Sequence, residues 1–344
     1  MLDPARLDQL LEQFSGKTVA LVGDLFLDRY LEIDREIAEK SIETGLPIHQ
    51  VTKIRNSPGA LGTVVNNLAA LGAGRLIPVT IIGDDGHADD LVRSLSSLPV
   101  DLDHIIRSPG RMTPTYTKPM RQNSDGEWQE LNRLDMFSRS PLDEASERLL
   151  ADHLQQALHE ADGLVVLDQM NDPRLGVINA TTRQFLHQLA GQQSLPVIID
   201  SRTHLHAFSC GILKGNTTEI QAAWKTLSGK QEELDEAILQ LAGQARQVVY
   251  CTRGDQGAVI GHPDGRCERI EGFPAEGPVD IVGAGDSATS GFFLSLLSTA
   301  TPAEAAVVGN LVASVTVRQL GTTGTASPQQ VRERLQESIN GGSG

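Results

Sequence analysis

The chain has 344 residues with a formal net charge of −15, and 40% of the residues are hydrophobic. This length suits one large α/β domain, so we treat residues 1–344 as a single domain. So acidic a chain is a poor candidate for binding nucleic acid or a membrane surface, and no apolar run approaches the ~20 residues of a membrane span. The three cysteines have no CxxC spacing, which is typical of reduced thiols. We therefore expect a cytoplasmic protein.

The first half of the chain alternates between predicted strands and helices, with two interruptions. A strand begins at Lys17 and runs into the acidic segment GDLFLD. The extended segments 31–57 and 111–135 do not fit the alternation, and the second contains a hairpin-type turn at SDG. We expect these two segments to pair as a small β-sheet lid.

The second half of the chain alternates regularly. The apolar segments GLVVLD, LPVIID and QVVYC are separated by helical segments, and two helices close the chain. Such alternation predicts a mainly parallel central sheet flanked by helices. Ligands bind at the carboxyl ends of the strands in such folds, which is where the lid would stand.

The segment DIVGAGD is the main indication of chemistry. Gly283, Ala284 and Gly285 form a turn almost without side chains, and Asp286 follows at the start of an apolar helix. Unpaired N–H groups at a helix start favour an anion, so we interpret the turn as an anion hole. Asp286 would then accept a proton from an attacking hydroxyl. The alternative, that Asp286 is only a helix N-cap, fits this segment equally well.

Two acidic segments can be interpreted in two ways. Asp24 and Asp28 follow the first strand and suit sugar hydroxyls, but a solvated strand end has the same composition. Asn216 and Glu219 open a helix in NTTE. They can hold Mg²⁺ near nucleotide phosphates, usually through water, or they can cap the helix.

Two turns bear on nucleotide binding. TRGDQG follows a strand, and Thr252, Gly254 and Gly257 give a turn that can lie against a nucleotide or serve as an ordinary hairpin. The segment after the first strand is GDLFLD and not GxGxxG. This argues against a nicotinamide oxidoreductase.

The ordered set of segments resembles the PfkB carbohydrate kinases, also called the ribokinase family. DIVGAGD is similar to the family signature DTxGAGD, NTTE to NxxE, and TRGDQG to TxGxxG; SPGALGTVVNNLAALG resembles the glycine-rich N-terminal signature. The resemblance runs from about Lys17 to Ser327. It implies a ribokinase-like α/β fold and ATP-dependent phosphorylation of a hydroxyl on a sugar or sugar phosphate.

The resemblance also implies roles for matching residues. Asp286 is implied as the catalytic base, with an anion hole formed by Gly283, Ala284 and Gly285. The implied ATP-binding residues are Asn216, Thr252, Gly254, Gly257 and Asn310. The implied substrate-binding residues are Asp24, Asp28, Gly59, Thr63, Lys118 and Arg133. The implied metal sites are Mg²⁺ at Glu219, through water, and a monovalent cation such as K⁺ at Asp280.

Within the family, GDLFLDRY, TPTYTKPMR and LNRLD look most like the heptose-7-phosphate kinase branch. For that branch, Lys118, Arg121 and Arg133 are candidates for the distal phosphate of the substrate, and solvated lid charge is the alternative. The family resemblance also implies a homodimer that forms through the lid.

Two positions depart from the family pattern. Thr63 stands where relatives carry an amide that is expected to contact the sugar, and Ile281 replaces a threonine of the signature. A hydroxyl is shorter than an amide and cannot make the same paired donor and acceptor contacts. Two alternatives therefore stay open: a kinase for another small alcohol, such as a ketose or nucleoside, and a non-catalytic sugar- or nucleotide-binding member of the same fold.

Overall fold

The computed structural model describes residues 2–34, 39–192 and 195–341. A nine-stranded sheet forms its centre, in the order β16-β15-β14-β13-β12-β11-β1-β6-β7. Neighbours are parallel except at β14–β15 and β15–β16, which confirms the mainly parallel sheet. The strands are β1 (Thr18–Gly23), β6 (Arg75–Gly83), β7 (Ile105–Ser108), β11 (Gly163–Asp168), β12 (Val197–Ser201), β13 (Ile212–Asn216), β14 (Val249–Thr252), β15 (Ala258–Gly261) and β16 (Cys267–Ile270).

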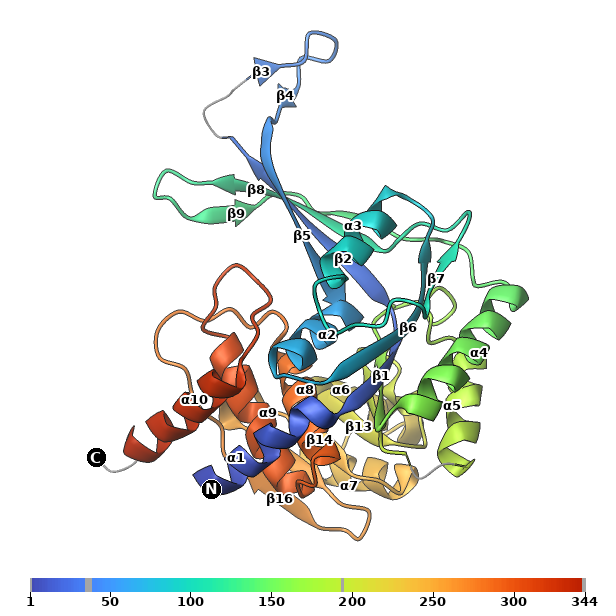
Figure 1. Ribbon diagram of the computed structural model, residues 1–344, viewed down its shortest axis with the longest axis vertical. Coiled ribbons are helices and arrows are strands. Elements are labelled where there is room, and N and C mark those ends of the chain that lie inside the picture. Colours follow the sequence, from blue (N-terminus) through green and yellow to red (C-terminus); the bar gives the residue numbers. More distant parts are fainter. Residues whose placement is uncertain (1, 35–38, 193–194, 342–344) are drawn as a thin grey trace.

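Helices cover both faces of this sheet (Figure 1). They are α1 (Pro4–Gln13), α2 (Leu61–Ala70), α3 (Gly86–Leu95), α4 (Glu144–Glu160), α5 (Ala180–Gln192), α6 (Thr217–Ser228), α7 (Leu234–Ala245), α8 (Ala284–Leu297), α9 (Pro302–Thr316) and α10 (Pro328–Gly341). In β1, Val19 and Leu21 pack into the core beneath α1, α2, α8 and α9, while Ala20 and Val22 pack into the core beneath α4–α7. Because successive side chains point to opposite faces, a strand covered on both sides is apolar throughout. No helix in the described ranges has the length and apolar character that a membrane span requires.

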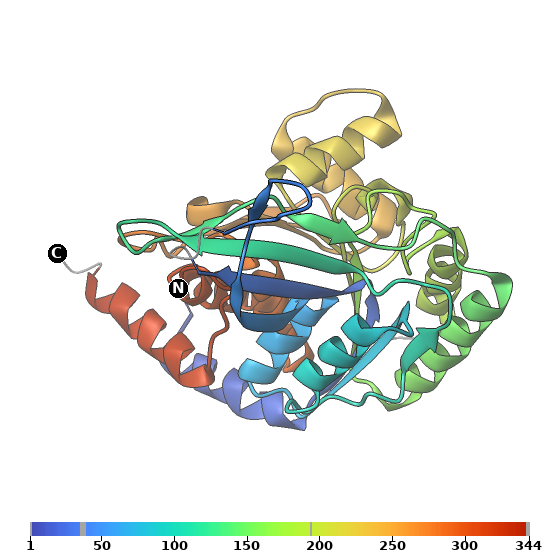
Figure 2. The ribbon, with the colours of Figure 1, turned by 90° about the horizontal axis from the view of Figure 1, so that it is seen from above.

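A second, smaller sheet projects from the body (Figure 1). Its strands are β2 (Leu25–Ile33), β5 (Val51–Ala60), β8 (Thr115–Gln122), β9 (Trp128–Glu130) and β10 (Leu134–Met136), with the hairpin β3 (Glu39–Lys40) and β4 (Pro47–Ile48) beyond them. β2 pairs with β8 in parallel and with β5 antiparallel, so the two extended segments do pair, as a mixed sheet. Seen from above, this sheet lies across the body between α10 and α4 (Figure 2).

The boundary between the two sheets differs from the sequence expectation. β1 ends at Gly23 and β2 begins at Leu25, so Asp28 belongs to the small sheet and does not follow the first strand of the main sheet. The small sheet takes strands within 25–60 and 115–136 rather than 31–57 and 111–135, and residues 35–38 lie outside the described ranges. Only Gly23 and Asp24 interrupt the apolar residues at the junction, and this two-residue break does not by itself show that the chain enters another sheet.

A strained residue joins β5 to α2. Ala60 has φ 50° and ψ −116°, a conformation that glycine adopts readily and residues with a Cβ avoid. The preceding Gly59 faces the small sheet closely, because a Cβ placed there would lie 2.5 Å from Oδ2 of Asp28. The N–H of Leu61 then donates to the backbone carbonyl of Asp24 at 3.1 Å. The strain at Ala60 therefore sits where the small sheet meets the body.

We predict that Ala60→Gly stabilises the protein by about 1 kcal/mol, because glycine removes the strain of a Cβ at positive φ. The free energy of unfolding from urea titration measures the effect. Ala69→Gly, within α2, is the matched control and should destabilise by about 1 kcal/mol. A lower free energy of unfolding for Ala60→Gly than for the parent would contradict the prediction.

Candidate active site

Helix α8 begins at a left-handed glycine and not at a capping side chain. Gly283 occupies the N-cap position with φ 80°, no side chain caps the helix, and Asp286 is the third helical residue. The interpretation of Asp286 as an N-cap is therefore wrong. Its carboxylate is therefore not used to cap the helix.

The first turn of α8 presents unpaired N–H groups. The N–H of Ala284 donates to the carbonyl of Ile281 at 3.1 Å, and that of Ser287 donates to the carbonyl of Gly283 at 2.9 Å. The N–H groups of Gly285 and Asp286 donate to no acceptor within the described ranges. The turn therefore offers an anion two donors together with the positive end of the helix dipole, and Ala284 contributes shape but no N–H.

Asp286 is half-buried beside these donors. Burial raises its pKa to about 7; the Asp200 carboxylate adds to this effect and the Lys214 ammonium opposes it. Glu219 raises the pKa further and Arg202 lowers it. A carboxylate with a pKa near neutral pH can take up a proton during a reaction and release it afterwards.

Asn216 and Glu219 cap helix α6. The N–H of Glu219 donates to Oδ1 of Asn216 at 3.0 Å, and the N–H of Asn216 donates to Oε2 of Glu219 at 2.8 Å. This is a capping box, so the capping interpretation is confirmed. Glu219 is half-buried, and burial raises its pKa. The Mg²⁺ role stays a prediction.

The TRGDQG turn packs tightly against β16. Thr252 ends β14, and Gly254 and Gly257 have φ 59° and 85°. A Cβ on Gly257 would lie 2.1 Å from the carbonyl oxygen of Ile270, so only glycine fits there. Nδ2 of Asn310, on α9, donates to the carbonyl of Glu271 at 3.0 Å.

These contacts show that two proposed nucleotide residues also hold the fold together. Gly257 and Asn310 both meet the segment that follows β16, from the turn and from α9 respectively. A ligand role does not conflict with such packing, because a glycine turn leaves its backbone open on its other side. The ATP-binding assignments stay predictions.

Lys118 and Asp28 form an ion pair on the small sheet. Their Nζ and Oδ1 atoms are 3.0 Å apart, and both side chains are largely buried. Nζ of Lys118 also donates to the hydroxyl of Tyr30 at 3.3 Å, and the Arg55 guanidinium lies 4.2 Å from the centre of the Tyr30 ring. Burial lowers the Lys118 pKa and is the largest single influence, but the Asp28 carboxylate and the Tyr30 hydroxyl together outweigh it, so the pKa is raised.

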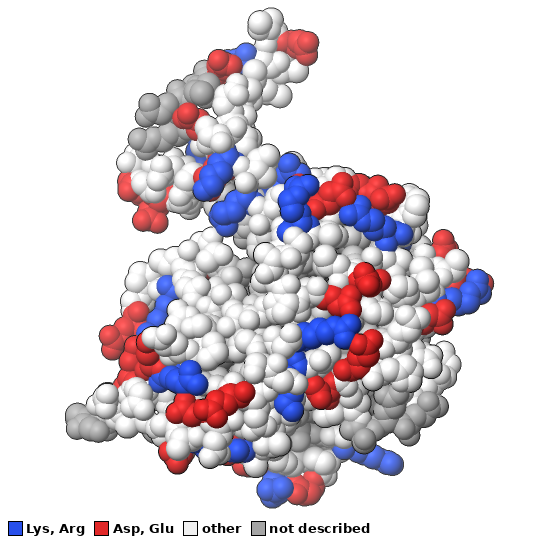
Figure 3. Space-filling model, in the orientation of Figure 1, with Lys and Arg blue, Asp and Glu red and all other residues white. Residues whose placement is uncertain are grey.

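The two arginines proposed beside Lys118 are placed differently. Nε and Nη2 of Arg133 donate to the two oxygens of Asp135 at 2.6 and 2.8 Å, and its guanidinium stacks 4.2 Å from the centre of the Tyr116 ring. Arg121 is exposed on β8. Of the three candidates, only Lys118 is brought against Asp28. Figure 3 shows Lys and Arg side chains on the small sheet, while uncharged residues cover the part of the body directly beneath it.

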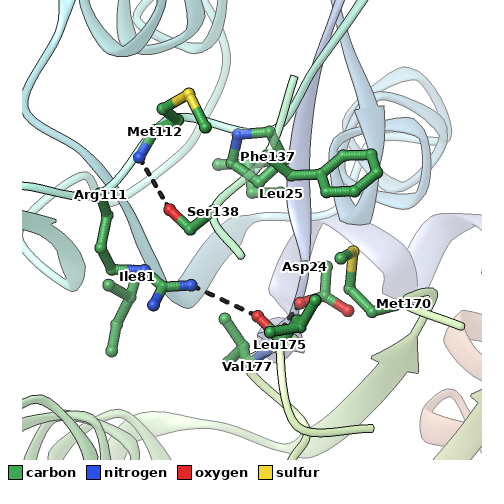
Figure 4. Close-up of a pocket in the computed structure, with 11 residues that line it drawn as sticks. Asp24, Leu25, Ile81, Arg111, Met112, Phe137, Ser138, Met170, Leu175 and Val177 are labelled. Carbon is green, nitrogen blue, oxygen red and sulfur yellow. Dashed lines mark hydrogen bonds between the residues drawn. The ribbon is translucent and has the colours of Figure 1, made fainter. Parts of the chain in front are cut away.

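Asp24 is buried at the junction between the sheets. Its Oδ1 accepts the N–H of Val177 at 2.7 Å and its Oδ2 accepts the N–H of Gln169 at 3.2 Å, while burial raises its pKa to about 6. Asp24 lines a pocket in which Arg111 donates to the carbonyl of Leu175 (Figure 4). Asp24 thus ties the junction to the loop after β11, and its sugar role stays a prediction.

Asp280 shapes the loop before α8. Its Oδ1 accepts the N–H of Val282 at 3.1 Å and its Oδ2 accepts the N–H of Gly321 at 3.0 Å. Carboxylate oxygens bound in this way retain lone pairs for a cation, so the K⁺ assignment stays a prediction. Ile281, which replaces the signature threonine, is 75% exposed.

Thr63 lies beside the anion hole. It is buried in the first turn of α2, and a Cβ on Gly283 would lie 3.3 Å from Cγ2 of Thr63. The residue that departs from the family pattern is therefore adjacent to the turn that we assign to the chemistry.

Three charged residues near the site were missed by the sequence analysis. Lys214 and Asp200 form a buried ion pair with Nζ and Oδ2 2.6 Å apart, and Arg202 affects the pKa of Asp286. All three stand at or near the carboxyl ends of β12 and β13. The available signal was a lysine within the apolar segment ILKGN and charged residues at the end of VIIDSR.

Sequence relatives cover nearly the whole chain. The chain is 30% identical over 322 residues to the bifunctional protein HldE of Mesorhizobium japonicum, with 93% of this chain and 62% of that protein aligned. The HldE of Trichlorobacter lovleyi is 28% identical, with 96% and 65% aligned. This chain therefore spans less than two thirds of the length of these relatives.

Solved structures share the fold. Ribokinase from Thermotoga maritima superposes with a TM-score of 0.68 at 20% identity, covering 93% of this chain and 99% of that one. Arabidopsis thaliana ribokinase complexed with ribose and ATP gives 0.64 at 17% identity, covering 93% and 98%. These superpositions confirm the ribokinase-like α/β fold. The family model described as pfkB family carbohydrate kinase matches residues 24–330. This chain belongs to that family.

Proposed function

We propose that this chain transfers the γ-phosphoryl group of ATP to a hydroxyl of a sugar or sugar phosphate. The observation that carries the proposal is the geometry at the start of α8, where Asp286, with a pKa of about 7, adjoins the free N–H groups of Gly285 and Asp286. A carboxylate of that pKa can accept the proton of the attacking hydroxyl. The N–H groups can stabilise the negative charge of the phosphoryl group.

The nucleotide side of the proposal rests on residues that line two turns and a helix. They are Asn216, Thr252, Gly254, Gly257 and Asn310. Structural neighbours support the choice of nucleotide, since one ribokinase was solved with ribose and ATP and that of Cryptococcus neoformans with ADP.

The chain provides one carboxylate suited to Mg²⁺ beside the site. Glu219 uses Oε2 in the capping box, which leaves Oε1 to hold the ion through water. The described ranges contain no cluster of three or more His, Cys, Asp or Glu side chains that could hold a metal, so phosphate oxygens would complete the coordination. Mg²⁺, when bound, neutralises phosphate charge. Asp280 is proposed to lie near a monovalent cation such as K⁺.

The acceptor would bind between the two sheets. Asp28, Gly59 and Thr63 would face the sugar, and Lys118 and Arg133 would face a distal phosphate. The resemblance of GDLFLDRY, TPTYTKPMR and LNRLD to the heptose-7-phosphate kinase branch supports a heptose phosphate as the acceptor. Arg133 would have to exchange its two bonds to Asp135 for bonds to phosphate.

The small sheet would act as a lid over the acceptor. Closing it excludes water, which would otherwise accept the phosphoryl group. The small sheet also carries exposed apolar side chains, among them Ile54, Trp128 and Leu134, which support a homodimer through the lid. The cytoplasmic location stays a prediction.

A nucleoside or ketose is the second candidate acceptor. Thr63 and Ile281 depart from the family pattern, and the nucleoside kinase of Burkholderia thailandensis in complex with inosine shares the fold with a TM-score of 0.63. A coupled ADP-release assay with heptose-7-phosphate, other sugar phosphates, sugars and nucleosides tests the proposal. ATP binding without turnover on any acceptor would favour a non-catalytic member.

We predict that Asp286→Asn lowers kcat by ~10²–10⁴-fold, the usual contribution of a general base, and leaves ATP affinity nearly unchanged. Titration calorimetry measures the affinity. In the parent, kcat should rise about tenfold per pH unit below pH ~7 and level off above it, because only the ionised carboxylate accepts the proton. Turnover of the variant close to that of the parent would contradict the assignment of Asp286 as the general base.

Asp286→Asn should also stabilise the folded protein at high pH. The folded state retains the Asp286 proton up to about pH 7, whereas the unfolded chain loses it near pH ~4. Unfolding therefore becomes easier as pH rises between these values, and the asparagine variant escapes this loss. The Tm difference, variant minus parent, should grow from pH 5 to pH 8.

The exposed Glu12→Gln is the matched control and should show no such trend. A Tm difference for Asp286→Asn that is equal at both pH values would contradict the effect.

We predict that Thr63→Asn moves specificity toward heptose-7-phosphate by about a decade or more. An amide donates and accepts through two separate atoms and reaches farther than a threonine hydroxyl. A mismatched polar contact in a closed site costs roughly 1–3 kcal/mol. The measurement is kcat/KM for heptose-7-phosphate against the other acceptors, with the exposed Thr226→Asn as control. If the parent already prefers heptose-7-phosphate and Thr63→Asn weakens that preference, the prediction is wrong. Thr63 would then make the same contact with the sugar that the amide makes in the relatives.

A further inference from the structure

A buried lysine lies beneath the start of α8. Lys214 is on β13, and its side chain is only 5% exposed. Its Nζ is 2.6 Å from Oδ2 of Asp200 on the neighbouring strand β12. The hydroxyl of Thr289, on α8, lies within hydrogen-bond distance of the same oxygen at 3.1 Å and of the Gly285 carbonyl at 3.0 Å. One carboxylate oxygen thus joins two strands to the helix that carries the anion hole.

The ammonium of Lys214 faces the anion hole because Gly285 has no side chain. A Cβ placed on Gly285 would lie 3.0 Å from Nζ of Lys214. The free N–H groups of Gly285 and Asp286 belong to the same turn. Three sets of donors, two from the backbone and one from the ammonium, therefore meet at one short stretch of chain.

The ammonium has donors to spare. It carries three N–H groups, and within the described ranges only Asp200 accepts one of them. Buried donors without acceptors are costly, so the arrangement favours an incoming acceptor atom. Stability is a weak explanation for the pair, because apolar side chains of similar size often replace a buried ion pair without loss.

We propose that Lys214 binds an oxygen of the phosphoryl group held at the N–H groups of Gly285 and Asp286, and that Asp200 positions it. This inference rests on the proposed kinase function. In the transfer, the bond from phosphorus to the acceptor oxygen forms and the bond to ADP breaks. The proton of the acceptor hydroxyl goes to Asp286. Lys214 forms no covalent bond and keeps its protons, and its charge balances the negative charge that the phosphoryl group brings to the turn.

Asp200 keeps the lysine charged in this buried place. Burial lowers the Lys214 pKa and is the largest single influence, but the carboxylates of Asp200, Asp286 and Glu219 together outweigh it, so the pKa is raised. The positive charge is therefore present without a ligand, and it does not depend on a phosphate to hold its proton.

The test compares ground-state binding with binding of a phosphoryl mimic. The probes are MgADP alone and MgADP with aluminium fluoride, whose fluoroaluminate takes the place of the transferred group, titrated calorimetrically. For Lys214→Met we expect ADP affinity within about threefold of the parent. The tightening by aluminium fluoride should fall at least tenfold, and kcat should fall ~10²–10³-fold, as when one oxyanion donor is removed. The KM for ATP should change little.

A second variant distinguishes loss of phosphoryl binding from loss of folding. Lys214→Met leaves Asp200 buried without its partner, so the double variant Lys214→Met with Asp200→Asn removes the unpaired charge. We expect the double variant to recover much of the lost Tm but neither the aluminium fluoride effect nor kcat. Lys230→Met, at an exposed lysine, is the matched control and should behave as the parent.

The outcomes separate this inference from the kinase proposal. Parent-like tightening and parent-like kcat in the double variant would overturn the role of Lys214 and leave the kinase proposal standing. A parent protein that releases no ADP with any acceptor, and gains no affinity from aluminium fluoride, would overturn the kinase proposal and this inference together.

Discussion

The site depends on one constraint, which is that the entrance to α8 carries no side chain that could fill it. Gly283 takes the left-handed conformation that starts the helix without a cap, so Asp286 is not used as one. Gly285 leaves room for the ammonium of Lys214 beneath the turn. Helix, strand and acid can therefore come close together, because glycine alone combines positive φ with the absence of a Cβ.

The charged groups in this region affect the pKa values of Asp286 and Lys214. Asp286, Asp200 and Glu219 would repel one another if Lys214 were absent, and Arg202 adds a second cation near them. The result is a carboxylate that ionises near neutral pH beside a permanent positive charge. Ionisation of Asp286 lowers the stability of the folded protein, because the surroundings raise its pKa. A raised pKa suits a proton acceptor, since the carboxylate must bind the proton during the reaction and release it afterwards.

Local patterns in the sequence predicted the parts of the fold and site that are themselves local. The glycine turn before Asp286, the cap formed by Asn216 and Glu219, and the alternation of strands and helices all lie within short windows. The division between β1 and β2 could not be predicted, because the two-residue break at Gly23 and Asp24 does not show that the next strand joins another sheet. The same holds for Lys214, whose partner lies on another strand, 14 residues away in sequence. Contacts between separate segments depend on topology, which hydrophobic periodicity does not encode.

Under the proposal, residues of both the small sheet and the body contact the acceptor, so both influence which acceptor binds. The ion pair of Asp28 and Lys118 belongs to the small sheet, whereas Thr63 and the anion hole belong to the body. In the proposed reaction, a sugar hydroxyl can donate to the second carboxylate oxygen of Asp28, and a phosphate can accept from the N–H group of Lys118 that Asp28 and Tyr30 do not use. The pair would then stay intact and present an anion and a cation side by side. Under the proposal, a phosphorylated sugar uses both charges, whereas a plain sugar uses only the carboxylate.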